Sequence, residues 1–220
     1  MAFEYVLPVG LHLGAELPPA IEEGYEVHWR DDEDLPHYFF YVQVSTLRLE
    51  RLVLDALRQL PAECQAVLEI RRSEEDMEAD PEGPAQDRWV SGVVAREDVL
   101  EVFERYRFQI LHDGTVGFGA YDPDSPLEVF VDDHKLVSLF APGLEPFEDA
   151  LAAHAVPFRE RIETVLDVDH EHYSLVAVPD RFPSPRREWL RRRRYDVEWF
   201  TRAIRSRLRM RLQPHCEAAE

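Results

Sequence analysis

The residues best suited to chemistry form one short segment in which two histidines alternate with acidic residues. Its sequence is Asp167-Val-Asp169-His170-Glu171-His172. Side chains two residues apart on an extended chain point to the same side, so His170 and His172 are expected to present two imidazoles together. Imidazole and carboxylate groups are ligands of zinc and related divalent metals. The pattern predicts a divalent-metal site, and the alternative interpretation is a polar turn between two strands.

Two histidines do not complete a metal site, because such sites use three or four protein ligands. Further donors lie close to predicted strand ends, at His112, Asp113, Asp132, Asp133 and His134. If these strands converge, the candidate ligands are His112, His134, Asp167, Asp169, His170 and His172. A metal-dependent enzyme that uses the Asp-x-Asp-His-Glu-His segment is therefore one functional hypothesis, although no residue is assigned to catalysis.

Other motifs of catalysis or nucleotide binding give no comparable pattern. The glycines of Gly114-Thr-Val-Gly117-Phe-Gly119 continue into a predicted strand, whereas a phosphate-binding loop leads from a strand into a helix. They favour a hairpin over a nucleotide site. Cys64 precedes an apolar strand, which is typical of a small buried residue. No organic cofactor is predicted.

The charge of the chain is divided unevenly along its length. Residues 186–220 hold eleven arginines and five acidic residues, a net charge of +6. The net charge of the whole chain is −19, so residues 1–185 carry a net charge of −25. Residues 184–213 are predicted to form one long amphipathic helix, with Ser184 as its cap and Pro185 in its first turn. The residues suited to binding on this helix are Arg187, Arg191, Tyr195, Trp199, Arg202, Arg205 and Arg209.

Three interpretations of this helix are open: nucleic-acid binding, membrane-surface binding, and packing on the acidic body or on a second copy. An attached helix meets its own body at millimolar effective concentration, whereas non-specific DNA binding has a dissociation constant of about 10⁻⁴ to 10⁻⁶ M. The acidic body also repels other polyanions. Packing is therefore favoured, nucleic acid is disfavoured, and no membrane is expected.

The acidic surface that remains would attract basic partners through electrostatic steering. The leading hypothesis is thus a non-enzymatic module that binds a basic protein, in the manner of an inhibitor or immunity protein, or that associates with itself. The alternatives are the metal-dependent enzyme and nucleic-acid binding through the C-terminal helix. Two cysteines, Cys64 and Cys216, are too few for a disulfide scaffold, which favours a cytoplasmic location.

The elements that must position these residues indicate an α+β fold. Antiparallel or mixed sheets with helices on one face are expected, together with the long C-terminal helix. The predicted division is a strand-helix-strand subdomain at 1–72, an acidic loop or linker at 73–88, an α+β subdomain with a β-meander at 89–183, the helix at 184–213 and a flexible tail at 214–220. Strands are also expected at 107–112, 163–168 and 173–178, with a tight hairpin turn at Asp113-Gly114.

Overall fold

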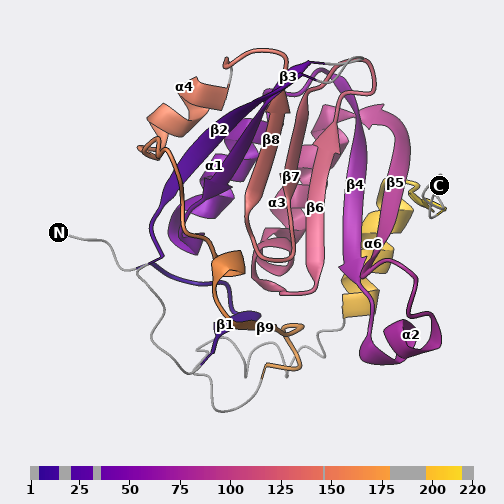
Figure 1. The fold of residues 1–220 in the computed structure, drawn as a ribbon. Helices are drawn as coiled ribbons and strands as arrows, with labels where there is room; N and C mark the ends of the chain where they lie inside the picture. Colours follow the sequence, from indigo (N-terminus) through magenta and orange to yellow (C-terminus); the bar gives the residue numbers. More distant parts are fainter. Residues whose placement is uncertain (1–4, 15–20, 32–35, 146, 179–196, 215–220) are drawn as a thin grey trace.

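Eight strands form one antiparallel sheet in the computed structural model, which describes residues 5–14, 21–31, 36–145, 147–178 and 197–214 (Figure 1). In chain order the strands are β2 (Gly24–Arg30), β3 (His37–Gln43), β4 (Glu63–Arg71), β5 (Gln86–Ala95), β6 (Val116–Tyr121), β7 (Glu128–Val131), β8 (Val137–Ala141) and β10 (Arg211–Leu212). Their order across the sheet is β10-β5-β4-β6-β7-β8-β3-β2. A separate antiparallel pair, β1 (Leu11–Leu13) and β9 (His170–His172), lies below one end of this sheet in Figure 1.

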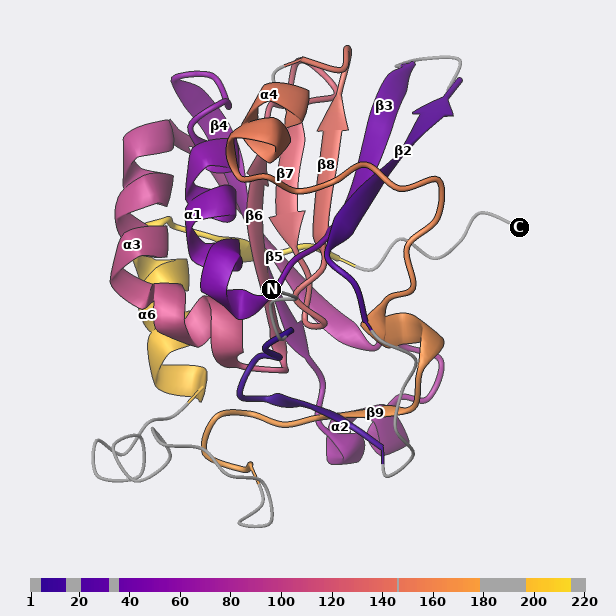
Figure 2. The ribbon, with the colours of Figure 1, turned by 90° about the vertical axis from the view of Figure 1, so that its left-hand side faces the viewer.

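Three helices lie on one face of the sheet, as Figure 2 shows: α1 (Thr46–Leu57), α3 (Arg96–His112) and α6 (Val197–Arg207). The shorter α4 (Phe147–Ala153) contacts α1, and α2 (Glu74–Ala79) lies beyond the end of β4 (Figure 1). The Ser45 side chain caps α1 by accepting a hydrogen bond from the Leu47 amide. The expected α+β fold, with helices packed on one face, is confirmed.

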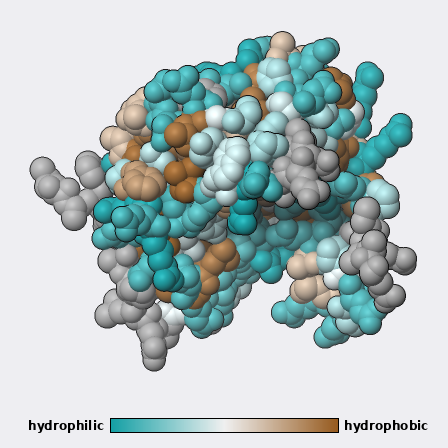
Figure 3. Space-filling model, turned by 45° about the horizontal axis from the view of Figure 1, so that its top comes forward, coloured by the Kyte–Doolittle hydropathy of each residue, from teal (hydrophilic) through white to brown (hydrophobic). Residues whose placement is uncertain are grey.

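The core lies between the sheet and these helices. Alternate strand residues such as Phe40 and Phe118 are fully buried there, and so are Phe103 of α3 and Phe200 of α6. The intervening strand residues form the other face of the sheet, which none of the described helices covers (Figure 2). On the surface presented in Figure 3, hydrophobic side chains of the described residues lie in small groups between hydrophilic ones. This is the usual pattern of a solvated surface.

Three predicted strands and one predicted hairpin turn are wrong. Residues 107–112 continue helix α3 instead of forming a strand, so Asp113-Gly114 follows a helix and is not a hairpin turn. Aromatic and β-branched residues favour strands locally, but Val102, Tyr106 and Ile110 keep helical spacing and are all buried. Of the strands expected at 163–168 and 173–178, the first contains the short helix η1 (Val165–Asp167) and the second is not a strand; β9 lies between them.

The acidic segment expected as a linker at 73–88 joins two neighbouring strands of the single sheet, β4 and β5. It contains α2, whose first turn is closed by a reciprocal capping box between Ser73 and Asp76. Within the part of the chain that the structure describes, no helix has the length and apolar character needed to cross a membrane.

The described part of the C-terminal helix is α6, and residues 184–196 of the predicted helix lie outside the described residues. The helix ends at Arg207, short of the expected end at residue 213. Arg209 adopts a left-handed backbone conformation with φ of 51°, and the Met210 amide donates to the Arg205 carbonyl at 2.9 Å. This termination resembles a Schellman motif and turns the chain toward the edge of β5, where β10 pairs with it.

Helix α6 is held to the body mainly by apolar packing. Phe200, Ile204 and Leu208 are buried against the core, as expected for a packed helix. Arg207 also forms ion pairs of 2.9 Å with Asp98 and Glu101 of α3, but all three side chains are solvent-exposed. Exposed ion pairs contribute at most about 1 kcal/mol each, so burial dominates the docking.

Substitution of Ile204 by alanine is therefore expected to lower the free energy of unfolding by about 2 to 3 kcal/mol, because it leaves a cavity under α6. Trp199 on the same helix is 60% exposed and serves as the matched control. Trp199→Ala should cost less than about 1 kcal/mol. Urea denaturation followed by circular dichroism measures both changes. Equal losses in the two variants would contradict docking through the Ile204 side of the helix.

Candidate metal centre

Strand β9 places two imidazoles on one side of the chain. It pairs with β1 so that His170 lies opposite Leu13 and His172 lies opposite Leu11. Glu171, between the two histidines, points the other way and is exposed, where it accepts a hydrogen bond from the Tyr173 hydroxyl. The alternation expected from the His-x-His spacing is thus present in β9.

The third imidazole comes from the turn that joins β7 to β8. In this turn the Asp132 carboxylate accepts a hydrogen bond from the Leu136 amide at 2.9 Å, and Lys135 has a left-handed φ of 65°. The ammonium group of Lys135 is buried and donates to the carbonyls of Val116 and Asp132. These contacts fix the turn at the sheet end that faces β9, with His134 between the sheet and the β1–β9 pair.

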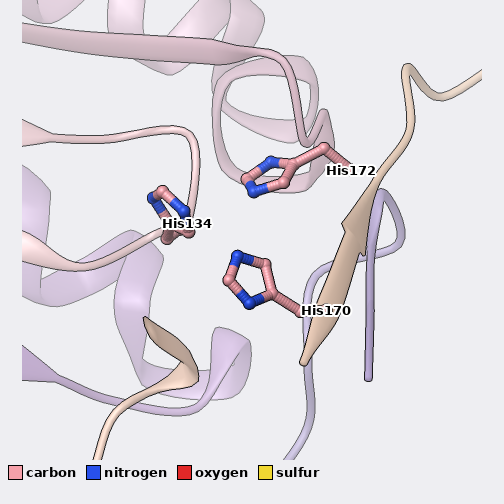
Figure 4. A group of neighbouring side chains, drawn as sticks. All are labelled: His134, His170 and His172. Carbon is pink, nitrogen blue, oxygen red and sulfur yellow. The ribbon is translucent and has the colours of Figure 1, made fainter. Parts of the chain in front are cut away.

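The side chains of His134, His170 and His172 point toward one another (Figure 4). One ring nitrogen from each lies within 4.8 Å of the other two. The ring centroids are 4.5 Å apart for His134 and His172 and 5.1 Å apart for the two other pairs. We call this group the histidine cluster. Its members come from segments that are remote in sequence and meet through the fold.

The Nδ1 atom of every imidazole in the cluster faces an oxygen acceptor. His134 Nδ1 lies 3.0 Å from an Asp133 oxygen and 3.3 Å from an Asp132 oxygen. His170 Nδ1 lies 2.8 Å from the Val168 carbonyl oxygen, and His172 Nδ1 contacts the Gly114 carbonyl oxygen. Carbonyl and carboxylate oxygens only accept hydrogen bonds, so each Nδ1 carries the hydrogen. Each neutral ring therefore keeps the lone pair of Nε2 for another partner.

Asp133 connects the cluster to the sheet. Its side chain is only 2% exposed, and its two oxygens engage different partners. One oxygen contacts His134. The other accepts a hydrogen bond of 2.8 Å from Nε of Arg71, the last residue of β4, and lies 2.8 Å from its Nη2 in an ion pair. The same Arg71 nitrogen, Nη2, lies 3.4 Å from His172 Nε2. Asp133 thus fixes the positions of two groups beside the cluster.

The electrostatic environment gives the cluster residues different pKa values. Burial disfavours the His172 cation and the nearby Arg71 charge adds to this effect, so the pKa of His172 falls to about 4. Burial also lowers the pKa of His134, but its contacts with Asp132 and Asp133 outweigh burial and raise the pKa to about 9. Burial alone would raise the pKa of Asp133, yet His134 and Arg71 together hold it well below its usual range. Asp132 and Asp133 therefore stabilise the protonated, positively charged form of His134.

A small apolar cluster and a close backbone contact hold the β1–β9 pair in place. Leu11, Leu136 and Val165 pack together behind the strands. At the adjoining turn, a Cβ atom on Gly114 would come within 2.1 Å of the Gly10 carbonyl oxygen. The backbones of β1 and of the turn after α3 approach so closely because both residues are glycine. The carbonyl that orients His172 belongs to this turn.

The structure brings only some of the predicted ligands together: His134, His170 and His172 converge, whereas His112, Asp167 and Asp169 have other contacts. His112 Nδ1 accepts a hydrogen bond from the Val9 amide at 3.3 Å, and its ring packs on Phe108. Asp167 closes the capping box of η1 with Thr164. Asp169 is exposed and lies beside Gly14.

Asp133 and Arg71 also contribute to the surroundings of the histidine cluster. Asp133 is one of the further donors that the sequence suggests, and it contacts His134. Asp132, Asp133 and His134 also form a second group whose possible ligand atoms lie close together. The sequence does not indicate Arg71, because a single arginine at a strand end has no distinctive pattern. Only the pairing of β4 with β6 and of β6 with β7 brings Arg71 to the turn that carries Asp133.

The arginine-rich helix lies apart from the histidine cluster, on the helix-covered face of the sheet (Figure 2). Arg202 and Arg205 both pair with Glu198, and the Arg205 guanidinium lies 4.3 Å from the centre of the Trp89 ring. Arg209 and Trp199 are exposed. Arg187, Arg191 and Tyr195 lie outside the described residues.

Comparisons of the chain with protein-family models, with curated proteins and with solved structures find no match, so only the geometry of the chain itself bears on its function.

Proposed function

We propose that this chain binds one divalent transition metal of the zinc type at His134, His170 and His172, and that it is a metal-dependent hydrolytic enzyme. The observation that carries the proposal is the engagement of all three Nδ1 atoms by oxygen acceptors. Metal-binding histidines in proteins almost always donate their other ring N–H to a carboxylate or a backbone carbonyl. An accidental group of three histidines has no reason to share this arrangement.

The three imidazoles suit a transition metal that is intermediate between hard and soft, such as zinc. Imidazole binds zinc, copper, nickel and iron well, whereas calcium and magnesium prefer oxygen ligands. Zinc–nitrogen bonds are about 2.0 to 2.1 Å long, which places two nitrogens of one tetrahedral centre about 3.3 Å apart. The three ring nitrogens here lie within 4.8 Å of one another. Metal binding therefore requires the three nitrogens to move closer together than they are in this structure.

Three histidine ligands leave one tetrahedral position for water or substrate, which is the arrangement of catalytic rather than structural zinc sites. A metal in such a site lowers the pKa of its bound water to about 7 and so supplies a hydroxide nucleophile. The cluster residues have separate tasks in this scheme. The histidines hold the metal, Asp133 orients His134, and Arg71 offers a hydrogen-bond donor next to His172.

Metal titration of the untagged protein tests the proposal. The wild-type chain is expected to bind one equivalent of Zn²⁺ or Co²⁺, and His170→Ala/His172→Ala is expected to lose this binding because two of its three ligands are gone. His28→Ala/His37→Ala provides a matched control, since these histidines lie at the far end of β2 and β3. Isothermal titration calorimetry and metal analysis of the dialysed proteins measure stoichiometry and affinity.

A wild-type chain without stoichiometric metal would refute the metal centre. Metal loss in the control variant as well as in the cluster variant would show that the ligands lie elsewhere. Hydrolytic activity is then tested by screening the zinc-loaded protein against ester, phosphate-ester and amide substrates, with the cluster variant as the blank. The hypothesis that the acidic surface binds a basic protein or a second copy stays a prediction.

A further inference from the structure

We propose that the open coordination position of this metal centre binds an oxyanion, of the carboxylate or phosphate kind, and that Arg71 is the residue that holds it. The inference rests on the proposed metal function and goes further by naming the chemical class of the ligand. It depends on three features of Arg71: its distance from His172, its anchoring by Asp133, and the charge balance around the cluster.

The distance places the guanidinium beside the fourth ligand position. Arg71 Nη2 lies 3.4 Å from His172 Nε2. Two donor atoms bound to the same tetrahedral zinc are about 3.3 Å apart. Because Nη2 is this close to one proposed ligand atom, it is within reach of an oxygen bound to the same metal. When a metal takes the Nε2 lone pair, the contact with Nη2 is released. A modest rotation then lets the same N–H group donate to an oxygen bound to the metal.

The anchoring keeps Arg71 close while leaving donors available. Nε donates to the buried Asp133 carboxylate, Nη2 lies 2.8 Å from the same carboxylate oxygen, and the Arg71 backbone amide donates to the Thr115 carbonyl at 2.8 Å. None of the hydrogen bonds among the described residues uses Nη1. The Arg71 side chain is 28% exposed, so it is accessible from solvent. Arginine is always charged, and its planar fork matches the two oxygens of a carboxylate or phosphate.

The charge balance favours an anionic ligand. A divalent metal and Arg71 contribute +2 and +1, and Asp132 and Asp133 contribute −1 each, so the site with neutral imidazoles carries a net charge of +1. The nearby Glu69 is paired with Arg88 at 2.8 Å and adds no net charge. One anionic group in the open position therefore neutralises the site, although the chain as a whole carries −19.

Cobalt provides a direct readout, because the visible absorption of a four-coordinate Co²⁺ site changes when its open position gains a ligand. The Co²⁺-loaded full-length protein is titrated separately with inorganic phosphate and with acetate. We expect at least one of them to change the spectrum saturably. Arg71→Gln should weaken this binding tenfold or more and leave Co²⁺ affinity within a few-fold of wild type. Arg202→Gln, on α6 and away from the cluster, should leave anion affinity unchanged.

A second variant, Arg71→Lys, tests the same role if Arg71→Gln fails to fold. It keeps a positive charge next to Asp133 but lacks the planar fork of arginine. It is expected to remain folded and to bind the anion less tightly. Anion affinity that is the same in wild type, Arg71→Gln and Arg71→Lys would overturn the role of Arg71, and a spectrum that neither anion changes would overturn the oxyanion site. Absence of Co²⁺ binding would instead refute the metal centre itself. The anion that binds more tightly distinguishes a phosphate ligand from a carboxylate ligand.

Discussion

Replacement of Gly114 by alanine is expected to lower the free energy of unfolding by about 3 kcal/mol or more and to abolish metal binding. The new Cβ atom would lie 2.1 Å from the Gly10 carbonyl oxygen and 3.1 Å from the Tyr173 carbonyl oxygen. Both are backbone atoms that cannot rotate aside as a side chain does, so one of the segments has to move. Overpacking in well-packed regions costs about 1 to 3 kcal/mol and sometimes more.

The effect on metal binding follows from the hydrogen bonds around Gly114. Its amide donates to the Tyr173 carbonyl at 3.0 Å, the Tyr173 amide donates to the Gly10 carbonyl at 2.8 Å, and its own carbonyl accepts from His172 Nδ1. Movement of this turn therefore displaces β9, which carries two of the three histidines. The strain acts on the cluster without changing any proposed ligand.

Gly92→Ala is the matched control, because nothing lies within 4 Å of a Cβ atom at this position in β5. It should change the free energy of unfolding by less than about 1 kcal/mol and leave metal affinity unchanged. Urea denaturation and metal titration of both variants give the comparison. A Gly114→Ala protein as stable as Gly92→Ala would show that the β1–β9 pair does not depend on this close contact.

The sequence predicts the local geometry of the candidate site better than its assembly. The His-x-His spacing places His170 and His172 on the same side of an extended segment, and β9 has this arrangement. The convergence with His134 depends on which strands are neighbours in the sheet and on where the β1–β9 pair packs. These are long-range properties, whereas the alternation of side chains on a strand is a local one.

The fold shows the same difference between local features, which the sequence predicts, and long-range features, which it does not. Caps, strands and the one-sided placement of helices follow from residues close in sequence, as in α1 with its Ser45 cap. Residues 107–112 are misassigned because aromatic residues favour strands in isolation, whereas here Tyr106 and Ile110 are buried on one side of a continuous helix. Tertiary burial overrides the local preference. The sequence does not place Arg71 near the cluster, because Arg71 ends β4 whereas its partner Asp133 lies in the turn between β7 and β8. Only the long-range order of the strands brings them together.

Asp133 is the second position where a large effect is expected, because one buried carboxylate holds two groups of the candidate centre. Asp133→Asn should lower the free energy of unfolding by about 2 kcal/mol, since it removes the buried charge that pairs with Arg71, while the 28% exposure of Arg71 lets solvent offset part of the loss. It should also weaken metal binding by about 10- to 100-fold, the usual cost of removing a carboxylate that orients a ligand histidine. The substitution keeps the side-chain volume, so a cavity does not explain the loss.

Asp132→Asn is the comparison that isolates the buried carboxylate. The Asp132 side chain is 27% exposed and lies 3.3 Å from His134, against 3.0 Å for Asp133. Asp132→Asn should therefore lower the free energy of unfolding and the metal affinity by less than about half as much as Asp133→Asn does.

Because the pKa of Asp133 is lowered in the folded protein, its carboxylate stabilises the fold at neutral pH. The stability difference between wild type and Asp133→Asn should shrink as the pH falls below about 4, the ordinary pKa of an aspartate. Equal metal affinities in wild type and Asp133→Asn would mean that His134 does not need this carboxylate to bind the metal, and Asp133 would then serve the fold alone.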